Sequence, residues 1–283
     1  MKLVTWNIQW GRGADGRVDL DRVVADLRRF CPDADVVCLQ EVSAGFEDLP
    51  GVADAVDQFA ALAARLPGHA LIDGAATDLP GAGRARRRFG NAILTRLPVR
   101  QVLRHLLPWL ADPEVKSMQR AAVEATLDAP FGPLRVTTTH LAYYSARQRV
   151  VQVERLHELQ REGHAHALQP RRRGRGPFTV EPRGVGSVVC GDFNCRPEAP
   201  ERARLTAPFD DATPTLRDAW ELMHPGVPHP PTVGLYDKAQ WPGEPFTFDY
   251  VLVSADLAPR VRALDVDAVT AASDHQPLRL ELA

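Results

Sequence analysis

Short apolar runs rich in Val, Leu and Thr recur along the chain, and Gly, Pro or Asp residues bound them. This pattern is typical of β-strands. It predicts ten strands, at residues 2–8, 35–41, 69–73, 90–95, 99–106, 120–127, 134–141, 186–192, 246–253 and 277–282. Short turns connect several successive strands, which are therefore expected to pair antiparallel. Many strands with few helices between them predict a layered α/β (α+β) domain with mixed sheets.

Helical spacing of apolar residues is confined to three segments. Helices are predicted at residues 20–30, 55–66 and 146–162. The third is the clearest, because Ser145 and Gln148 form a capping box and Gly163 is expected to end the helix. Residues 163–185, which contain Pro, Arg and Gly, are expected to form an irregular surface insertion. Neither a linker nor a repeat divides the chain.

The composition is that of an ordinary globular protein. The 283 residues are 45% hydrophobic and 25% charged, with a net charge of −2. No apolar stretch approaches the length of a membrane span. The first residues follow a strand pattern without the features of a signal peptide, and the four cysteines form no C-x-x-C pair. Both observations favour a cytoplasmic protein with reduced thiols.

The stretch "VVCGDFNCRP" at 188–197 starts as a buried strand and ends in Asp192 and Asn194. Alternate residues of a strand face the same side, roughly 7 Å apart, so both side chains can reach one small ligand. Asp and Asn are also common turn residues, and this pair alone would favour a turn.

Similar polar residues interrupt other strand patterns. They are Asn7, Gln40 with Glu41, His140, Asp249, and Asp274 with His275. Asp249 lies within an aromatic and aliphatic run, and a buried carboxylate needs a partner because its burial alone is costly. Carboxylates, amides and two histidines brought to one place predict a site for a cation with oxygen ligands and an anionic substrate.

These residues resemble the motif series of a known group, the endonuclease/exonuclease/phosphatase superfamily. The matching motifs are Asn7, "LQE" at 39–41, "TTHL" at 138–141, "GDFN" at 191–194, "FDYVLVS" at 248–254 and "SDH" at 273–275. The superfamily includes DNase I, exonuclease III-like repair nucleases, neutral sphingomyelinases and inositol polyphosphate 5-phosphatases. The resemblance implies one domain, 1–283, folded as a four-layer αββα sandwich. In that fold two mostly antiparallel mixed sheets pack face to face, with helices outside.

The resemblance also implies a metal-dependent phosphoester hydrolysis by in-line attack of water. Glu41 would be the main ligand of Mg²⁺, for which Mn²⁺ can substitute, and Asn7 and Asp274 would complete or border the metal site. Such ions prefer hard oxygen ligands. The implied partner is a phosphoester, with no obligate protein partner.

The remaining motif residues are implied to act on the phosphate and the water. Asp192 would orient or deprotonate the water, and Asn194 would hold the phosphate. His275, paired with Asp249, would act as general base or as a donor to a phosphate oxygen. His140 would bond the scissile phosphate or protonate the leaving group. The "THLAYY" sequence departs from the Tyr-Pro-Asn usual in the repair nucleases, which favours the DNase, sphingomyelinase or phosphatase branches.

The substrate is less closely specified. Candidate substrate contacts are Asn91, Arg120, Tyr143 and Trp241. Two basic runs, "RARRR" at 84–88 and "RRRGR" at 171–175, place nucleic acid ahead of a phospholipid or an inositol or sugar phosphate. An inactive adaptor on the same fold is the alternative from another class, but every catalytic position is filled, so an enzyme is expected.

Overall fold

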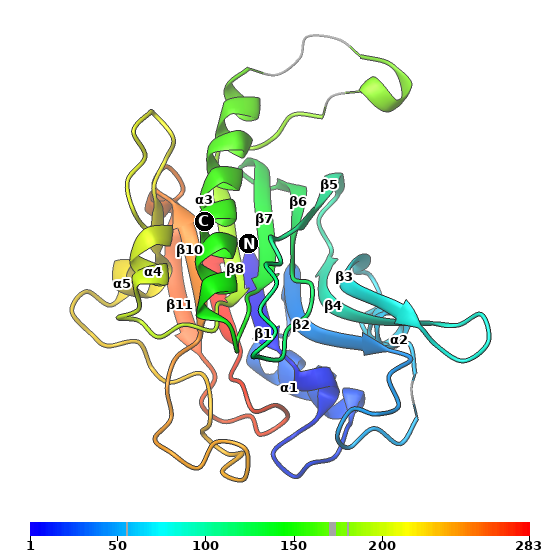
Figure 1. The fold of residues 1–283 in the computed structure, drawn as a ribbon. Coiled ribbons are helices and arrows are strands. Elements are labelled where there is room, and N and C mark those ends of the chain that lie inside the picture. The colour runs from blue at the N-terminus through cyan, green and yellow to red at the C-terminus, as the bar shows by residue number, and fades with distance from the viewer. Residues whose placement is uncertain (55, 170–173, 180) are drawn as a thin grey trace.

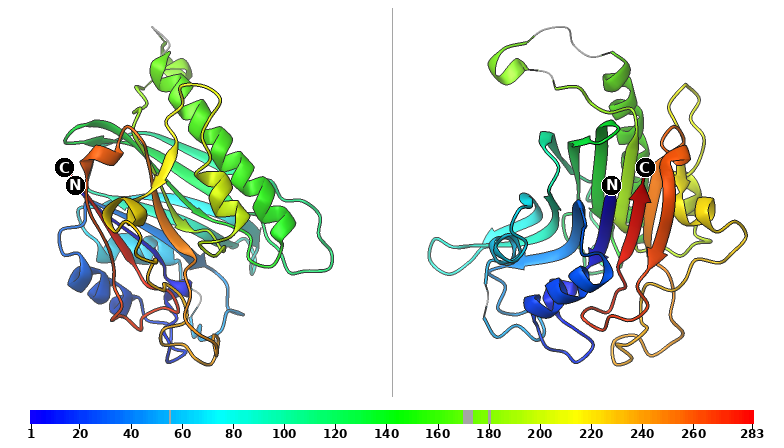
Figure 2. Two further views of the ribbon diagram at one scale, coloured as in Figure 1. Left: turned by 90° about the vertical axis from the view of Figure 1, so that its left-hand side faces the viewer. Right: turned by 180° about the vertical axis from the view of Figure 1, so that it is seen from behind.

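Two six-stranded sheets packed face to face form the centre of the protein, and the helices lie outside them (Figures 1 and 2). The computed structural model describes residues 1–54, 56–169, 174–179 and 181–283. The largest apolar cluster lies between the sheets and includes Cys38 and Ile93 of one sheet and Val123 and Cys190 of the other. The predicted four-layer sandwich is confirmed.

The first sheet has the order β11-β12-β1-β2-β4-β3. Its strands are β1 (Lys2–Asn7), β2 (Val36–Ala44), β3 (Ala70–Pro80), β4 (Arg86–Thr95), β11 (Val261–Val266) and β12 (Leu278–Leu282). β1 and β2 run parallel, and the other neighbours are antiparallel. The hairpin of β3 and β4 extends beyond the predicted strands because its outer part is built from charged and small residues that no apolar pattern marks.

The second sheet has the order β5-β6-β7-β8-β10-β9. Its strands are β5 (Val99–Leu106), β6 (Ala121–Ala129), β7 (Gly132–His140), β8 (Ser187–Asp192), β9 (Leu216–Asp218) and β10 (Asp249–Ser254). Only β7 and β8 run parallel among these neighbours. The edge strands β9 and β11 were not predicted from the sequence, since one has three residues and the other alternates only weakly.

The helices cover the outer faces of the sheets (Figure 2). They are α1 (Leu20–Phe30), α2 (Gln58–Arg65), α3 (Ala146–Leu168), α4 (Pro200–Leu205) and α5 (Ala219–Met223). Valine and leucine side chains of α1 pack on the first sheet, whereas those of α3 pack on the second. Ser145 caps α3 as predicted, and its side chain accepts from the backbone N–H of Gln148 at 3.2 Å.

The prediction that α3 ends at Gly163 is wrong, because the helix continues to Leu168. A Cβ on Gly163 would lie 1.9 Å from the Arg135 guanidinium. Glycine is therefore needed there for close packing against β7 and not as a helix stop. The predicted irregular insertion correspondingly begins later, and part of it, including 170–173, lies outside the described residues.

Strand direction brings the functional motifs to one edge of the sandwich. The two parallel pairs, β1 with β2 and β7 with β8, end at this edge, and β10 starts there. The register places Asn7 beside Gln40 in the first sheet, and His140 and Asp249 on either side of Asp192 in the second. The sheets are joined beneath the edge, where Gln40 Nε2 donates to Thr138 Oγ1 at 2.8 Å.

Candidate active site

Asp192, at the end of β8, lies at the centre of the polar cluster. Its Oδ2 accepts from Asn7 Nδ2 at 2.9 Å and lies 3.3 Å from His140 Nε2 and 3.8 Å from His275 Nε2. Its Oδ1 accepts from the backbone N–H of Asn194 at 2.9 Å. Burial raises the pKa of Asp192 to about 7, helped by the negative charge of Asp249 and opposed by His275. This carboxylate can therefore take up and release a proton near neutral pH.

His275 and Asp249 form a buried pair. His275 Nδ1 and Asp249 Oδ2 are 2.8 Å apart, and the same oxygen accepts from Thr232 Oγ1 at 2.7 Å. Burial alone would lower the pKa of His275, but the carboxylates of Asp249, Asp274 and Asp192 outweigh it and hold this pKa well above its ordinary value. Asp249 thus has the partner that its burial requires, and the imidazole directs Nε2 toward Asp192.

His140 differs from His275 in its protonation. Burial, with the positive charges of Arg120 and His275, holds the pKa of His140 well below its usual range. The neutral ring faces two acids, since its Nε2 lies 3.8 Å from Glu41 Oε1 as well as 3.3 Å from Asp192 Oδ2.

Glu41 lies at an irregularity in β2, where the pairing with β4 shifts register. Its φ of +59° is in the left-handed region, which non-glycine residues seldom adopt and which is concentrated at functional sites. Asn7 Nδ2 donates to Glu41 Oε1 at 3.2 Å. Burial, and next the charge of Asp274, raise the pKa of Glu41. The bulge therefore turns an acid into the cavity against electrostatic repulsion.

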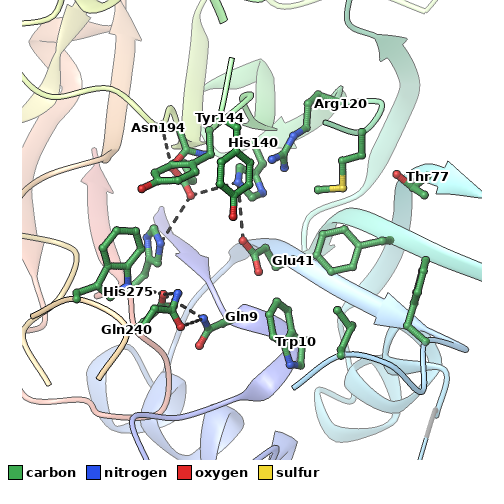
Figure 3. Close-up of a pocket in the computed structure, with 18 of the residues that line it drawn as sticks. Gln9, Trp10, Glu41, Thr77, Arg120, His140, Tyr144, Asn194, Gln240 and His275 are labelled. Carbon is green, nitrogen blue, oxygen red and sulfur yellow. Dashed lines mark hydrogen bonds and ion pairs between the residues drawn. The ribbon is translucent and has the colours of Figure 1, made fainter. Parts of the chain in front are cut away.

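Asp274 is held by three donors that converge on its Oδ2. They are Gln9 Nε2 at 3.1 Å, Gln240 Nε2 at 2.9 Å and Trp241 Nε1 at 2.9 Å. Gln9, Gln240 and the Thr232 bonded to Asp249 were not identified from the sequence, because each lies on a short irregular segment with no periodic pattern. Figure 3 shows Gln9 and Gln240 side by side below His275.

The predicted metal ligands differ in how well their free atoms suit a cation. Glu41 Oε2 and Asp274 Oδ1 are hard oxygen donors left largely free by the hydrogen bonds around them. Asn7, in contrast, uses its oxygen on the backbone N–H of Gln9 and its amide hydrogens on Glu41 and Asp192. In this structure its side chain joins the two carboxylates. The buried cluster of Asp192, Asp249 and His275 also has ligand atoms within 4.8 Å of one another and could hold a metal.

A cavity of about 670 Å³ opens over this cluster (Figure 3). Nine of the predicted site residues line it: Glu41, Arg120, His140, Tyr143, Asp192, Asn194, Trp241, Asp274 and His275. Asn7 and Asp249 lie beneath its floor, bonded to Asp192 and His275. The cavity thus has a strongly polar end built from both sheets.

The fold and the motif order agree with a family model. The model of the Endonuclease/Exonuclease/phosphatase family matches residues 4–275. The chain belongs to this family. Members of the family are phosphoester hydrolases, so the protein is an enzyme of that class.

Several solved structures of the family share this fold. A family member from Beutenbergia cavernae is 26% identical, with a TM-score of 0.65, and the match covers 100% of this chain and 72% of that one. A mannosyl-6-phosphatase from Bacteroides thetaiotaomicron is 17% identical (TM-score 0.67, 100% and 99% covered). The catalytic domain of human Nocturnin, with a bound sulfate anion, is 19% identical (TM-score 0.61, 100% and 94% covered). Comparison with curated proteins gives no significant match.

Of the four predicted substrate contacts, three line the cavity and one does not. Tyr143 and Trp241 stand at the cavity wall with ring centroids 6.0 Å apart, and Arg120 points into the cavity near His140 (Figure 3). Asn91 lies behind the wall, where its side chain is 2% exposed and donates to the carbonyl of Ala121 at 3.0 Å. In this position Asn91 ties β4 to the start of β6 and does not face the cavity.

The basic run at 84–88 is largely neutralised by neighbouring acids. Ion pairs join Arg86 to Asp78, Arg87 to Asp48, and Arg88 to Asp57 and Asp73. Residues 171–173 of the second run lie outside the described residues. None of the helices in the described ranges is both long and apolar enough to span a membrane.

Proposed function

We propose that this protein hydrolyses phosphoesters, phosphodiesters in particular, by metal-assisted attack of water at the polar end of the cavity. The observation that carries the proposal is the position of Asp192 Oδ2, within 2.9 to 3.8 Å of Asn7, His140 and His275. A carboxylate that titrates near neutrality, surrounded by an amide and two imidazoles, is suited to position and deprotonate a water molecule.

The two histidines have different roles in this scheme. His275 remains protonated, so its Nε2 donates to a phosphate oxygen instead of acting as the base, while Asp249 fixes the ring. His140 is neutral and donates from Nε2 to the phosphate. Arg120 supplies a second positive charge, because it points into the cavity and has no ion-pair partner within the described ranges. Asn194 borders the same phosphate position.

Glu41 and Asp274 would hold Mg²⁺, or Mn²⁺ in its place, because their free oxygens are hard ligands. When bound, the ion supplies charge stabilisation of the phosphate and of the leaving oxygen. Burial, and next the repulsion from Asp274, raise the pKa of Glu41, and a cation at this point would offset both. Asn7 keeps the Glu41 carboxylate at a fixed distance from Asp192.

Nucleic acid is one substrate class to test, since the motifs suit DNA or RNA as well as phospholipids and sugar or inositol phosphates. In the sequence, only the two basic runs favour nucleic acid over the other classes. Pairing of Arg86, Arg87 and Arg88 with acids leaves little net charge there to release counterions from a polyanion.

The decisive experiment is a hydrolysis screen of the purified protein with Mg²⁺ or Mn²⁺. Substrates are plasmid DNA, single-stranded DNA, RNA, sphingomyelin, inositol phosphates and bis-p-nitrophenyl phosphate. We expect turnover of at least one phosphoester that stops in EDTA and returns with excess metal.

The Glu41→Ala variant tests the metal ligand directly. It should lower kcat/KM by roughly a hundredfold or more and shift the metal requirement to much higher concentrations. Glu47→Ala is the matched control, because Glu47 is an exposed acid on the segment that follows β2. Full activity in EDTA, or equal metal dependence in the two variants, would contradict the proposal.

A further inference from the structure

The cavity has a second half that phosphate chemistry does not explain. Six apolar side chains line it: Trp10, Phe46, Leu49, Leu79, Phe89 and Met118. We call this half the apolar compartment. In Figure 3 Glu41 lies between His140 and Trp10, so the compartment borders the polar end directly. A bound phosphate would therefore carry its organic group next to these side chains.

Trp10 is held in the compartment by a strained but well-supported turn. Gln9 and Trp10 both have a φ of +44°, a conformation that costs non-glycine residues energy and persists only where the surroundings enforce it. Gln58 Nε2 donates to the Trp10 carbonyl at 2.7 Å, and the indole Nε1 donates to the Pro50 carbonyl at 3.0 Å. The indole is thus a fixed wall of the cavity.

The other rings pack around a single centre. Phe89 lies 6.4 Å from Trp10 and 6.3 Å from Phe46, measured between ring centroids, at tilted and edge-on angles. Such geometries let a further aromatic ring pack by offset or edge contacts. The hydroxyl of Thr77 adds a polar atom to this lining. It is buried and has no hydrogen-bond partner within the described ranges. Thr77 lies on the side of the cavity away from His275 (Figure 3).

We propose that the apolar compartment binds a planar aromatic ring carried by the organic group that is esterified to the scissile phosphate, with a polar atom of the ring's outer edge bonded to Thr77. This inference rests on the proposed function for the position of the phosphate. A flexible alkyl chain would leave the Thr77 hydroxyl unpaired, and a free sugar would place its hydroxyl groups against six apolar side chains. An aryl ester and the base of a nucleotide share the required chemistry.

The test is equilibrium binding of phosphonates, which the enzyme cannot turn over, to the purified protein in excess Mg²⁺. Phenylphosphonate is compared by calorimetry with methylphosphonate and cyclohexylphosphonate. We expect phenylphosphonate to bind about tenfold or more tightly than methylphosphonate, from the burial of one ring. It should also bind more tightly than cyclohexylphosphonate, which has the same size but is not planar.

Paired variants assign the preference to the compartment. Phe46→Ala with Leu79→Ala should remove most of the advantage of phenylphosphonate and leave methylphosphonate binding unchanged. The control is Phe178→Ala with Leu168→Ala, two exposed side chains outside the cavity, at 69% and 58% exposure. The control should keep the preference. Thermal unfolding of both double variants verifies that they fold.

Each result either supports or overturns the inference. Equal binding of the three phosphonates, no binding of any, or equal losses in the two double variants would overturn it. If cyclohexylphosphonate bound as tightly as phenylphosphonate, the requirement for a planar ring would be overturned. Hydrolysis-resistant 5′-phosphonate analogues of adenosine and ribose distinguish a nucleobase from the ring of an aryl ester. If the compartment binds a nucleobase, the adenosine compound must bind more tightly than the ribose compound. Turnover without a ring preference refutes only this inference, and ring-selective binding without turnover refutes only the proposed function.

Discussion

Two buried histidines of one site are driven to opposite charge states by their neighbours. Both rings are removed from water, which favours the neutral form. His275 has a carboxylate, Asp249, at 2.8 Å from Nδ1, and its pKa is raised. At His140 burial is the main influence, with the positive charges of Arg120 and His275 added to it, and its pKa is lowered. The carboxylates around His275, with Asp249 the largest influence, therefore make that ring the cation.

The pairing of Asp249 with His275 can be measured by a double-mutant cycle. We expect His275→Ala to lower kcat by roughly a hundredfold or more, and Asp249→Asn to lower it less because the ring remains. The double variant should be no worse than His275→Ala alone, since the pair acts as a unit. Asp256→Asn, at an exposed position just after β10, is the control and should retain full activity. Strictly multiplicative losses would contradict the pairing.

At the level of the elements, backbone irregularities direct the proposed catalytic side chains into the cavity. A bulge turns Glu41 out of β2, and two left-handed residues fold the chain after β1. In β8, Gly191 has a φ of +132°, and a Cβ there would lie 2.0 Å from the carbonyl oxygen of Thr139 on β7. The close approach of β7 and β8 sets His140 against Asp192.

We expect Gly191→Ala to separate these strands and weaken both stability and catalysis. Gly132→Ala is the matched control, because Gly132 also has a positive φ, of +114°, but open space where a Cβ would stand. The Gly191 variant should be less stable by about 1–3 kcal/mol beyond the control, measured by urea unfolding. It should also lose activity, whereas the control should not. Equal effects of the two substitutions would show that the contact with Thr139 does not matter.

The apolar runs of the sequence predict the strands that carry the site. The polar residues that interrupt these runs predict which side chains form it. Asp192 and Asp249 are recognisable for this reason. Contacts between segments that are distant in the sequence leave no comparable pattern of polar and apolar residues. The need for Gly163 comes from Arg135 on another element, and the support of Asp274 comes from Gln240 on an irregular loop. Asn91 has the expected residue type but faces another strand, which only the packing of the sheets determines.

The whole molecule also depends on a buried charge network away from the cavity. Glu124 on β6 is 2% exposed and pairs with Arg183, and Arg135 donates to the carbonyl of Gly184 at 2.9 Å and to Gln160 Oε1 at 3.0 Å. The network fixes the segment after α3 to the second sheet. Burial would raise the pKa of Glu124, but His105, Arg135 and Arg183 lower it to about 2.

This lowered pKa predicts an acid-dependent part of the stability. A carboxyl group whose pKa is lower in the folded state stabilises the fold above its unfolded pKa of about 4.5, and this contribution is lost as the pH falls toward 2. The contribution is roughly 3 kcal/mol. Glu124→Gln should lose it at neutral pH and show a flatter decline of unfolding free energy between pH 4.5 and 2. Glu158→Gln, at an exposed site on α3, is the control and should decline as the unmodified protein does.

The polar end of the cavity is shared between two sheets that touch only through side chains. Asn7 belongs to one sheet and Asp192 to the other, and their 2.9 Å contact spans the boundary, with the bond of Gln40 to Thr138 beneath it. The apolar side chains between the sheets, including Cys38 and Cys190, consequently set the spacing of the sheets. That spacing in turn sets the distances between the site residues of the two sheets. Selection on these inward-facing side chains would then act on alignment of the reaction as well as on folding, although none of them ever meets a substrate.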